Sequence, residues 1–413
     1  MTESDLFKPK RPLWLSMLNA YGTNRLIGWV PPKIDEETLV KKAMRRTGLR
    51  DFGDERIREA LRVLVASQQQ TPLNYFGRCW FHDEIIRRLS NRLWVQEAIS
   101  KHPSILEIPI KRPVFILGLP RTGTTVLQRL FMEDPKNRIL TTLDCYWPVM
   151  PRSGTKKAEK AVKQGYDLFN KIVPNFRLIH DMGAHQPEEC INLNANDLLS
   201  VYFVISMKLT DYGLWLGEQD LTFVYQCHKR QLQLFQSRSE FDRWVLKAPA
   251  HIYGLEWLLK VYPDAVILWL HRDPLEAIPS MASLTQHWRS IGFDEISLSE
   301  IGEETLIFLE EWVARGMKAR STAEADPSCQ ATFFDIHYRD VVSDPVAVIQ
   351  NVYKALGLEL SGSVKEKMHS YLVSTPRNKH GKHNYSLEKF GLNREAIGER
   401  FNEYIKRFNI GVK

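Results

Sequence analysis

Cysteine is scarce in this sequence: there are five among 413 residues, widely spaced and without a CxxC pair. An odd, scattered set excludes a disulfide framework and a zinc site built from paired cysteines, and it is typical of a reducing compartment. Long hydrophobic runs are missing too, because the longest, 198–207, is far short of the roughly 20 residues that span a membrane. The N-terminus lacks the apolar stretch of a signal peptide. We therefore expect a soluble, cytoplasmic protein.

Blocks of one charge are also missing. The net charge is +7, but the basic residues are scattered, so the sequence does not indicate a nucleic-acid partner. His180 and His185 are five apart with no further ligand spacing around them, so we expect no metal site. What the chain does have is 44% hydrophobic and 11% aromatic residues, enough for a large buried core. Its length suits one large domain or two ordinary ones.

Residues 1–109 are predicted to form an arm followed by a helical layer. The arm contains Trp14, Leu15 and Leu18 beside basic residues, which fits either a peripheral membrane contact or packing on the protein's own core or on a partner subunit of a homo-oligomer. The short amphipathic run favours packing. From Asp35, a helix-capping residue, to about residue 101 the pattern is helical, with apolar residues of 56–65 at helical spacing.

Residues 110–413 alternate short apolar strands with amphipathic helices. This alternation predicts an α/β fold in which helices flank both faces of a parallel central sheet. The helix with the clearest apolar face is 221–235. The predicted strands are 114–117, 244–246, 265–270 and 332–336.

The first strand runs into a loop with the length of a phosphate-binding P-loop but without its lysine. A Walker A loop ends in Gly-Lys-Ser/Thr, with the lysine on the terminal phosphates and the hydroxyl on magnesium. Here Thr124 takes the lysine position, and a cation stands inside the loop at Arg121. Gly118 and Gly123 let backbone N–H groups turn towards an anion at the start of the next helix. The loop predicts an anion site without the magnesium chemistry of an ordinary kinase.

A second anion site is predicted where the strand 265–270 ends. Arg272 follows this strand, and Ser280 lies eight residues later on the helix that Pro274 begins. The guanidinium and the hydroxyl can converge on one phosphate at the carboxyl edge of the sheet, where open α/β sheets bind ligands. Read alone, the same residues could equally be a turn and a helix-surface serine.

Taken together, the two motifs resemble the sulfotransferase family. Its members carry a Pro-(Lys or Arg)-x-Gly-Thr-Thr loop for a 5′-phosphosulfate and an Arg–Ser pair, eight apart, for a 3′-phosphate. Arg272 and Ser280 match the pair. The loop is matched by six consecutive residues: Pro120, Arg121, Thr122, Gly123, Thr124 and Thr125.

Three later segments extend this resemblance, which covers about residues 110–390. The strand ending in Lys247 looks like the segment that lines the transfer site, and the segment from Tyr338 to Leu358 is similar to the family's later core. The basic loop 377–385, with Lys382, resembles a loop that closes on the 3′-phosphate and adenine. The implied fold is a P-loop-like sulfotransferase core with a helical N-terminal extension, as in bacterial-type members.

The resemblance implies 3′-phosphoadenosine 5′-phosphosulfate (PAPS) as the donor co-substrate and no metal cofactor. The sulfuryl group carries less charge than a terminal phosphoryl group, so side-chain cations and loop amides can replace magnesium. In-line transfer to an acceptor hydroxyl builds up charge on the bridging oxygen. We expect Arg121 and Lys247 to stabilise that charge, and Thr124 and Thr125 to bind the 5′-phosphate.

The general base that removes the acceptor's proton is not decided by the sequence. Asp144 follows the first βα unit, where related enzymes often place a glutamate. His251 lies four residues after Lys247, rather than two as in the phenol-sulfating enzymes. Glu189 is the third candidate, although a carboxylate there also suits the start of a helix. We rank them in the order Asp144, His251, Glu189, with His180 and His185 next.

Two other functions compete with sulfuryl transfer to a small-molecule or lipid-like hydroxyl. A nucleotide or metabolite kinase with a degenerate P-loop would need the missing lysine. A non-catalytic nucleotide-binding protein would not need Lys247 or the acid–base candidates. The many apolar and aromatic residues of 140–215 favour a partly hydrophobic acceptor.

Overall fold

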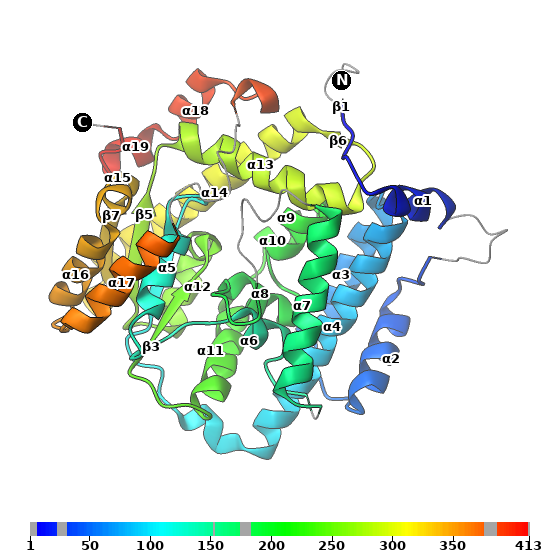
Figure 1. The fold of residues 1–413 in the computed structure, drawn as a ribbon, viewed down its shortest axis with the longest axis horizontal. Helices are drawn as coiled ribbons and strands as arrows, with labels where there is room; N and C mark the ends of the chain where they lie inside the picture. The colour runs from blue at the N-terminus through cyan, green and yellow to red at the C-terminus, as the bar shows by residue number, and fades with distance from the viewer. Residues whose placement is uncertain (1–5, 23–30, 152, 174–182, 376–385, 412–413) are drawn as a thin grey trace.

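The computed structural model describes residues 6–22, 31–151, 153–173, 183–375 and 386–411 and contains a parallel five-stranded sheet flanked by helices (Figure 1). The strand order is β3-β4-β2-β5-β7. The strands are β2 (Val114–Gly118), β3 (Asn137–Arg138), β4 (Arg243–Lys247), β5 (Val266–His271) and β7 (Thr332–His337). The four predicted strands are confirmed to within one residue at each end, and the two-residue edge strand β3 was not predicted. The α/β fold class is therefore confirmed.

Helices cover both faces of the sheet because its strands are apolar on both sides. Val114 and Ile116 of β2 belong to a cluster with helices α5 (Thr124–Met132), α16 (Pro345–Ala355) and α17 (Gly362–Ser374). Phe115 and Leu117, which point to the opposite face, belong to a larger cluster. Its helices include α11 (Thr222–Gln236), α12 (Leu255–Val261), α13 (Pro274–Gly292) and α14 (Leu298–Ala325).

The predicted helical layer consists of α2 (Glu36–Thr47), α3 (Arg56–Gln70) and α4 (Tyr75–Lys101). The Asp35 side chain caps α2 by accepting a hydrogen bond from the backbone N–H of Thr38, at 3.0 Å, as its sequence position predicted. The large cluster includes residues from Ile34 to Ile410, so this layer and the sheet share one hydrophobic core. The boundary near residue 109 stays a prediction about organisation along the chain.

The N-terminal arm packs on the core. Its elements are β1 (Leu6–Phe7), which pairs antiparallel with β6 (Ile296–Ser297), and α1 (Leu13–Tyr21). Leu15 is fully buried, and the Arg11 guanidinium donates to the Ser290 carbonyl. The packing favoured by the sequence is therefore observed for these residues.

Further helices connect β3 and β4 along the chain. They include α6 (Thr142–Tyr146), α7 (Thr155–Ile172), α8 (Cys190–Asn194), α9 (Tyr202–Met207) and α10 (Thr210–Gly217), while α15 (Tyr338–Ser343), α18 (Arg394–Arg400) and α19 (Asn402–Arg407) follow β7. Short 3₁₀ helices are labelled η, and they include η3 (Pro103–Glu107), η5 (Ala195–Asp197), η6 (Pro249–Ile252) and η7 (Glu388–Phe390). Within the described ranges, we find no helix that combines the length and the apolarity needed to cross a membrane.

Candidate active site

The predicted anion-binding loop lies between β2 and α5. Gly118 (φ 139°) and Gly123 (φ 90°) both have the positive φ that favours glycine, and Arg121 also adopts it (φ 67°). A Cβ on Gly118 would lie 2.2 Å from the Leu270 carbonyl oxygen, so glycine lets the loop begin against β5. Arg121 holds an uncommon left-handed conformation for a non-glycine residue, a form of strain found at binding sites.

The threonines of the loop differ in what their side chains can reach. Thr122 is fully buried, and its hydroxyl donates to the Leu119 carbonyl at 2.8 Å, so its side chain stabilises the turn. Pro120 is buried and has no N–H to offer. Thr124 is buried and Thr125 exposed at the first turn of α5, where backbone N–H groups favour an anion.

Arg272 joins the second predicted anion site to this loop. Its Nη1 donates to the Arg121 carbonyl at 2.5 Å, and its guanidinium lies over the Tyr338 ring, 4.1 Å from the centroid. Glu276 pairs with it at 2.7 Å. Ser280 lies on the same helix, α13, and is buried. The two motifs, about 150 residues apart in the sequence, therefore meet at one edge of the sheet.

A buried cation and a carboxylate pair at the end of the neighbouring strand β4. Lys247 has a side chain only 1% exposed, and its Nζ contacts Glu189 Oε1 at 2.5 Å, whereas the Glu189 side chain is 26% exposed. In the parallel register, Lys247 pairs with Ile116 of β2, two residues before the loop begins at Gly118. The structure thus brings Lys247 and Glu189 together beside the anion-binding loop.

Asp144 is held by contacts that stabilise the local fold. Arg138 donates to both of its carboxylate oxygens, at 2.9 and 2.8 Å. The backbone N–H and the hydroxyl of Thr141 donate to Oδ2, completing a capping box at the start of α6. These four hydrogen bonds give the Asp144 carboxylate a role in the local fold.

His251 faces the hydrophobic core. It is 1% exposed, its Nδ1 lies 3.0 Å from the Tyr225 hydroxyl, and its ring packs edge-on against Phe115. Its Nε2 has no hydrogen-bond partner among the described residues, and His251 helps to line a cavity of about 30 Å³, which has room for one or two waters. Sequence spacing placed this histidine near the transfer site, but its contacts are those of a core residue.

Buried histidines should make the fold sensitive to acid. Burial lowers the pKa of His228 to about 3, and burial together with the neighbouring His228 lowers the pKa of His251 well below its ordinary value. Below pH ~6.5 these histidines bind protons in the unfolded chain but stay neutral in the folded chain. The free energy of unfolding should therefore decrease as the pH decreases. The loss can reach about 1.4 kcal/mol per pH unit for each histidine.

Urea denaturation at pH 7, 6 and 5 measures this loss. His228→Gln can keep the hydrogen bond to the Tyr262 hydroxyl (2.8 Å in the wild type) and should give a shallower decline. Equal slopes for the variant and the wild type would show that His228 does not contribute to acid sensitivity.

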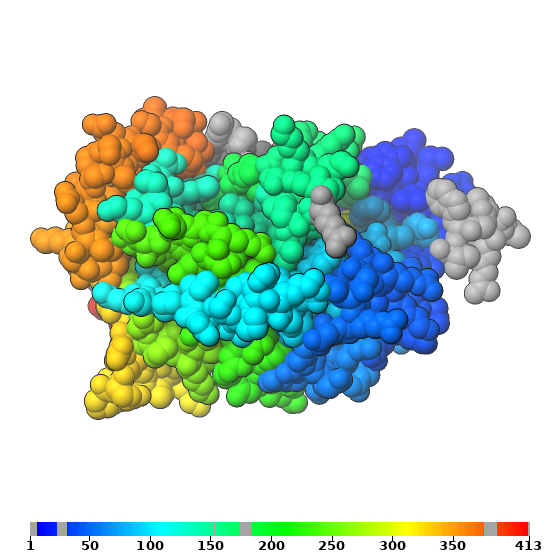
Figure 2. Space-filling view, turned by 90° about the horizontal axis from the view of Figure 1, so that it is seen from below, coloured from blue at the N-terminus to red at the C-terminus, as the bar shows by residue number. Residues whose placement is uncertain are grey.

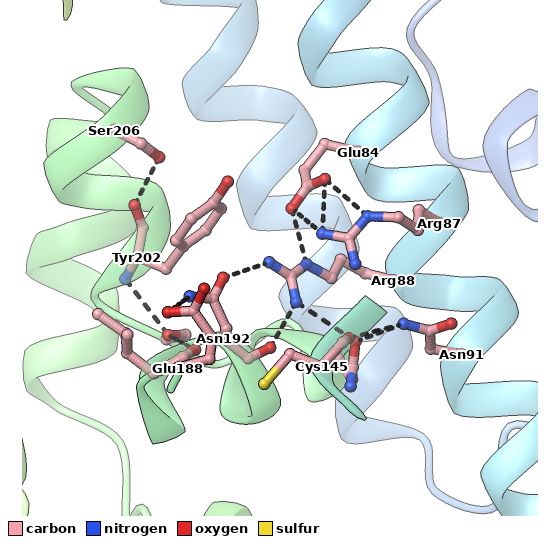
Figure 3. A network of polar contacts seen from close by, with 12 residues as sticks. Glu84, Arg87, Arg88, Asn91, Cys145, Glu188, Asn192, Tyr202 and Ser206 are labelled. Atoms are coloured by element: carbon pink, nitrogen blue, oxygen red, sulfur yellow. Dashed lines mark hydrogen bonds and ion pairs between the residues drawn. The ribbon is translucent and has the colours of Figure 1, made fainter. Parts of the chain in front are cut away.

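A buried polar network on α4, which the sequence analysis missed, supports the segment that carries Glu189 (Figure 3). Glu84 accepts from Arg87 and Arg88. Burial alone would raise the pKa of Glu84, but the two guanidinium groups lower it to about 2. Arg88 Nη2 donates to Asn192 Oδ1 at 3.0 Å, and Asn192 Nδ2 donates to Glu188 Oε1 at 3.2 Å.

The network ends next to the Lys247–Glu189 pair. Glu188 Oε1 also accepts from the backbone N–H of Glu189 at 2.9 Å. From the other side, Gln128 of α5 donates to the Glu188 carbonyl at 3.0 Å. Glu189 is therefore held between the helical layer and the helix that begins at the anion-binding loop. The spacing of Glu84, three and four residues before two arginines, was the available sequence signal.

A second cluster that the sequence analysis missed fixes the residue before Arg272. His271 Nε2 lies 2.8 Å from Asp335 of β7, and its Nδ1 lies 3.1 Å from the Tyr404 hydroxyl of α19. Arg320 of α14 donates to both Asp335 oxygens. Three elements that follow β5 in the chain, α14, β7 and α19, thus hold the end of β5 in place.

Two sequence-predicted residues, Lys382 and His180, lie outside the described residues. His185 is exposed and contacts Glu159 at 2.9 Å. In the part of the chain that the structure describes, no three histidine, cysteine, aspartate or glutamate side chains form a group that could hold a metal ion.

The sheet, the anion-binding loop and the pair at the end of β4 define a P-loop-like transferase. A model of the sulfotransferase family matches residues 113–362, more than half of the chain, so the chain belongs to the sulfotransferase family. The suspected resemblance is confirmed, and the kinase alternative is set aside.

Two solved sulfotransferase structures are similar to this fold over nearly the whole chain. Sulfotransferase STF9 from Mycobacterium avium shares 29% sequence identity and a TM-score of 0.83, over 92% of this chain and 98% of that one. Sulfotransferase STF1 from Mycobacterium tuberculosis H37Rv shares 30% identity and a TM-score of 0.73, over 90% of this chain and 99% of that one. The helical layer before the sheet is included in this similarity.

A characterised relative is 24% identical over 309 residues, which are 72% of this chain and 74% of that protein. It is the omega-hydroxy-beta-dihydromenaquinone-9 sulfotransferase Stf3 of Mycobacterium bovis, and a Mycobacterium tuberculosis protein of the same name matches equally.

Proposed function

We propose that this sulfotransferase moves the sulfuryl group of PAPS to a hydroxyl of a lipid-like acceptor. The observation that carries the proposal is that three adjacent parallel strands end together, β4 in Lys247, β2 in the loop with Arg121, and β5 just before Arg272. Cations from all three strands therefore surround one edge of the sheet, as an anionic donor requires.

The donor set fits a ligand with two phosphate positions. Arg272 and Ser280 would hold the 3′-phosphate, with Tyr338 supporting the guanidinium. The loop amides, Arg121, Thr124 and Thr125 would hold the 5′-phosphosulfate at the N-terminus of α5. Because Arg272 also donates to the Arg121 carbonyl, the two positions are coupled through one short contact. Lys382 stays a further candidate for the 3′-phosphate.

The Lys247–Glu189 pair would carry out the transfer. Glu189 takes the proton of the acceptor hydroxyl while the acceptor oxygen forms its bond to sulfur and the bond from sulfur to the bridging oxygen breaks. Lys247 and Arg121 stabilise the charge that grows on the bridging oxygen, and adenosine 3′,5′-bisphosphate leaves. Glu189 now ranks before Asp144 and His251, because it is part-exposed and contacts the buried cation, whereas they serve the local fold and the core.

The name of the characterised relative supports a lipid-like acceptor, since it refers to a hydroxylated menaquinone. The test is transfer of label from ³⁵S-labelled donor in parallel reactions with an omega-hydroxylated dihydromenaquinone, a long-chain alcohol, a phenol, a sugar and a peptide. We expect label on one of the two lipid alcohols. Transfer to the sugar or peptide alone would overturn the acceptor class, and absence of transfer to every acceptor would overturn the activity.

The donor site predicts tight binding of adenosine 3′,5′-bisphosphate in excess chelator, measured by calorimetry, with ATP much weaker. Arg272→Ala should weaken this binding by about 2–4 kcal/mol because a charge-assisted contact loses one partner. Ser280→Ala should cost about 1 kcal/mol, as for one neutral hydrogen bond.

Two controls separate binding from folding. Arg400→Ala breaks a comparable arginine–glutamate contact, to Glu310 at 3.1 Å on the surface, and should leave affinity unchanged. A ligand without the 3′-phosphate should respond little to Arg272→Ala. A large loss for that ligand as well would mean that Arg272 is structural, and a strict magnesium requirement would revive the kinase hypothesis.

A further inference from the structure

Helix α1 presents an apolar stripe to solvent. Leu13 is 77% exposed, Met17 and Tyr21 are each 50% exposed and Trp14 is 44% exposed, while Leu15 on the opposite side is fully buried. Positions 13, 17 and 21 follow the four-residue spacing of one helical face, and Trp14 flanks them. The sequence had suggested Trp14, Leu15 and Leu18 as the apolar contact, but Leu15 and Leu18 pack inward, so Leu13, Met17 and Tyr21 replace them.

Helix α7 presents a basic stripe. Its five lysines are exposed, and its only acids are Glu159 and Asp167, so the helix carries a net charge of +3 (five minus two). Ala158, Val162 and Ile172 form its buried face. The basic stripe consists of Lys156, Lys157, Lys160, Lys163 and Lys171.

The two stripes belong to neighbouring helices. Leu15 of α1 shares a buried cluster with Ile172 at the end of α7, and Leu18 and Phe169 pack against this cluster. Seen from below, α7 (green) and α1 (dark blue) lie next to each other along the upper margin of the molecule (Figure 2). The exposed apolar side chains of α1 therefore adjoin the Lys171 end of α7, and the other four lysines extend from there along the same helix.

We infer that this surface docks on an anionic lipid membrane, with the α1 stripe in the interface and the α7 lysines on the lipid phosphates. A stripe of leucine, tryptophan, methionine and tyrosine beside lysines is the chemistry of interfacial helices. Each lysine near an anionic surface adds attraction that disappears on a neutral one. A second copy fits less well, because four side chains are few for a stable interface and a two-fold contact would bring two positive helices together.

The inference does not depend on the proposed acceptor, since vesicle binding requires neither donor nor turnover. The test is flotation of the full chain with phosphatidylcholine vesicles and with vesicles that also contain phosphatidylglycerol. We expect binding to the anionic vesicles and at least tenfold weaker binding to the neutral ones. Leu13→Ser/Met17→Ser and Lys156→Glu/Lys160→Glu should each weaken anionic binding at least tenfold.

Matched controls lie at the opposite end of the molecule, on α16 and α17 (Figure 1). Lys354→Glu/Lys367→Glu reverses two exposed lysines there, and Val373→Ser replaces an apolar side chain that is 81% exposed. Both should bind anionic vesicles like the wild type. Equal binding by stripe and control variants would overturn the inference. So would a dimer in sedimentation that the α1 variants dissociate, because the stripe would then be a contact between copies.

Discussion

Lys247→Met should lower turnover by roughly a hundredfold or more while changing donor affinity only a few-fold. The reason is that the Lys247 ammonium would act mainly on charge that appears as the bridging oxygen leaves, not on the bound donor. Glu189→Gln should lower turnover similarly, because the amide cannot accept the acceptor's proton. Its pH–rate profile should also lose the acid limb, where the wild-type base becomes protonated. Steady-state kinetics with the labelled donor measure turnover, and calorimetry with adenosine 3′,5′-bisphosphate measures affinity.

The chain offers a matched control for this pair. Lys260 and Glu256 form an exposed contact of 2.8 Å on α12, and Lys260→Met and Glu256→Gln should leave turnover and donor affinity unchanged. Asp144→Asn and His251→Gln test the other candidates for the base. If either of them abolishes turnover while Glu189→Gln stays within a few-fold of the wild type, the proposed base is wrong.

Arg88→Met should lower the free energy of unfolding by about 3–5 kcal/mol, because it leaves a buried carboxylate without one of its two partners. The Arg88 side chain is 1% exposed and the Glu84 side chain 7% exposed. The variant should also lower turnover per folded molecule, since Arg88 holds Asn192, and Asn192 holds the residue beside Glu189. Urea denaturation measures the first effect, and kinetics corrected for the folded fraction measure the second.

Arg87→Met is the comparison that separates stability from positioning. Arg87 shares Glu84 with Arg88, but its other described contact is the Tyr146 ring, at 4.2 Å, and not α8. It should therefore destabilise the fold while turnover per folded molecule stays within a few-fold of the wild type. Equal losses of turnover in both variants would contradict a positioning role for Arg88.

Strands and capped helices could be predicted because their signals are local. The strands 114–117 and 265–270 are apolar runs bounded by charged turns, and Asp35 and Pro274 stand at helix starts as capping rules require. β3 could not be predicted, since Asn137 and Arg138 carry no apolar pattern and pair with β4 only at the edge of the sheet. The network around Arg88 was missed because the spacing of Glu84 before two arginines does not show that these charges are buried.

By itself, the sequence determined the sulfotransferase family and predicted the residues of the donor side of the site. The glycines and the arginine of a phosphate-binding loop, and the helix that follows it, lie within a few residues of one another. Such a contiguous motif can be recognised in the sequence alone. Only the tertiary structure separates the candidates for the acceptor side by their contacts. Glu189 and Lys247 are 58 positions apart, and nothing local distinguishes that carboxylate from Asp144. The Asp144 carboxylate forms part of its own capping box, whereas the Glu189 carboxylate contacts the buried ammonium of Lys247, which needs a partner. Only the folded chain shows which of the two carboxylates is that partner.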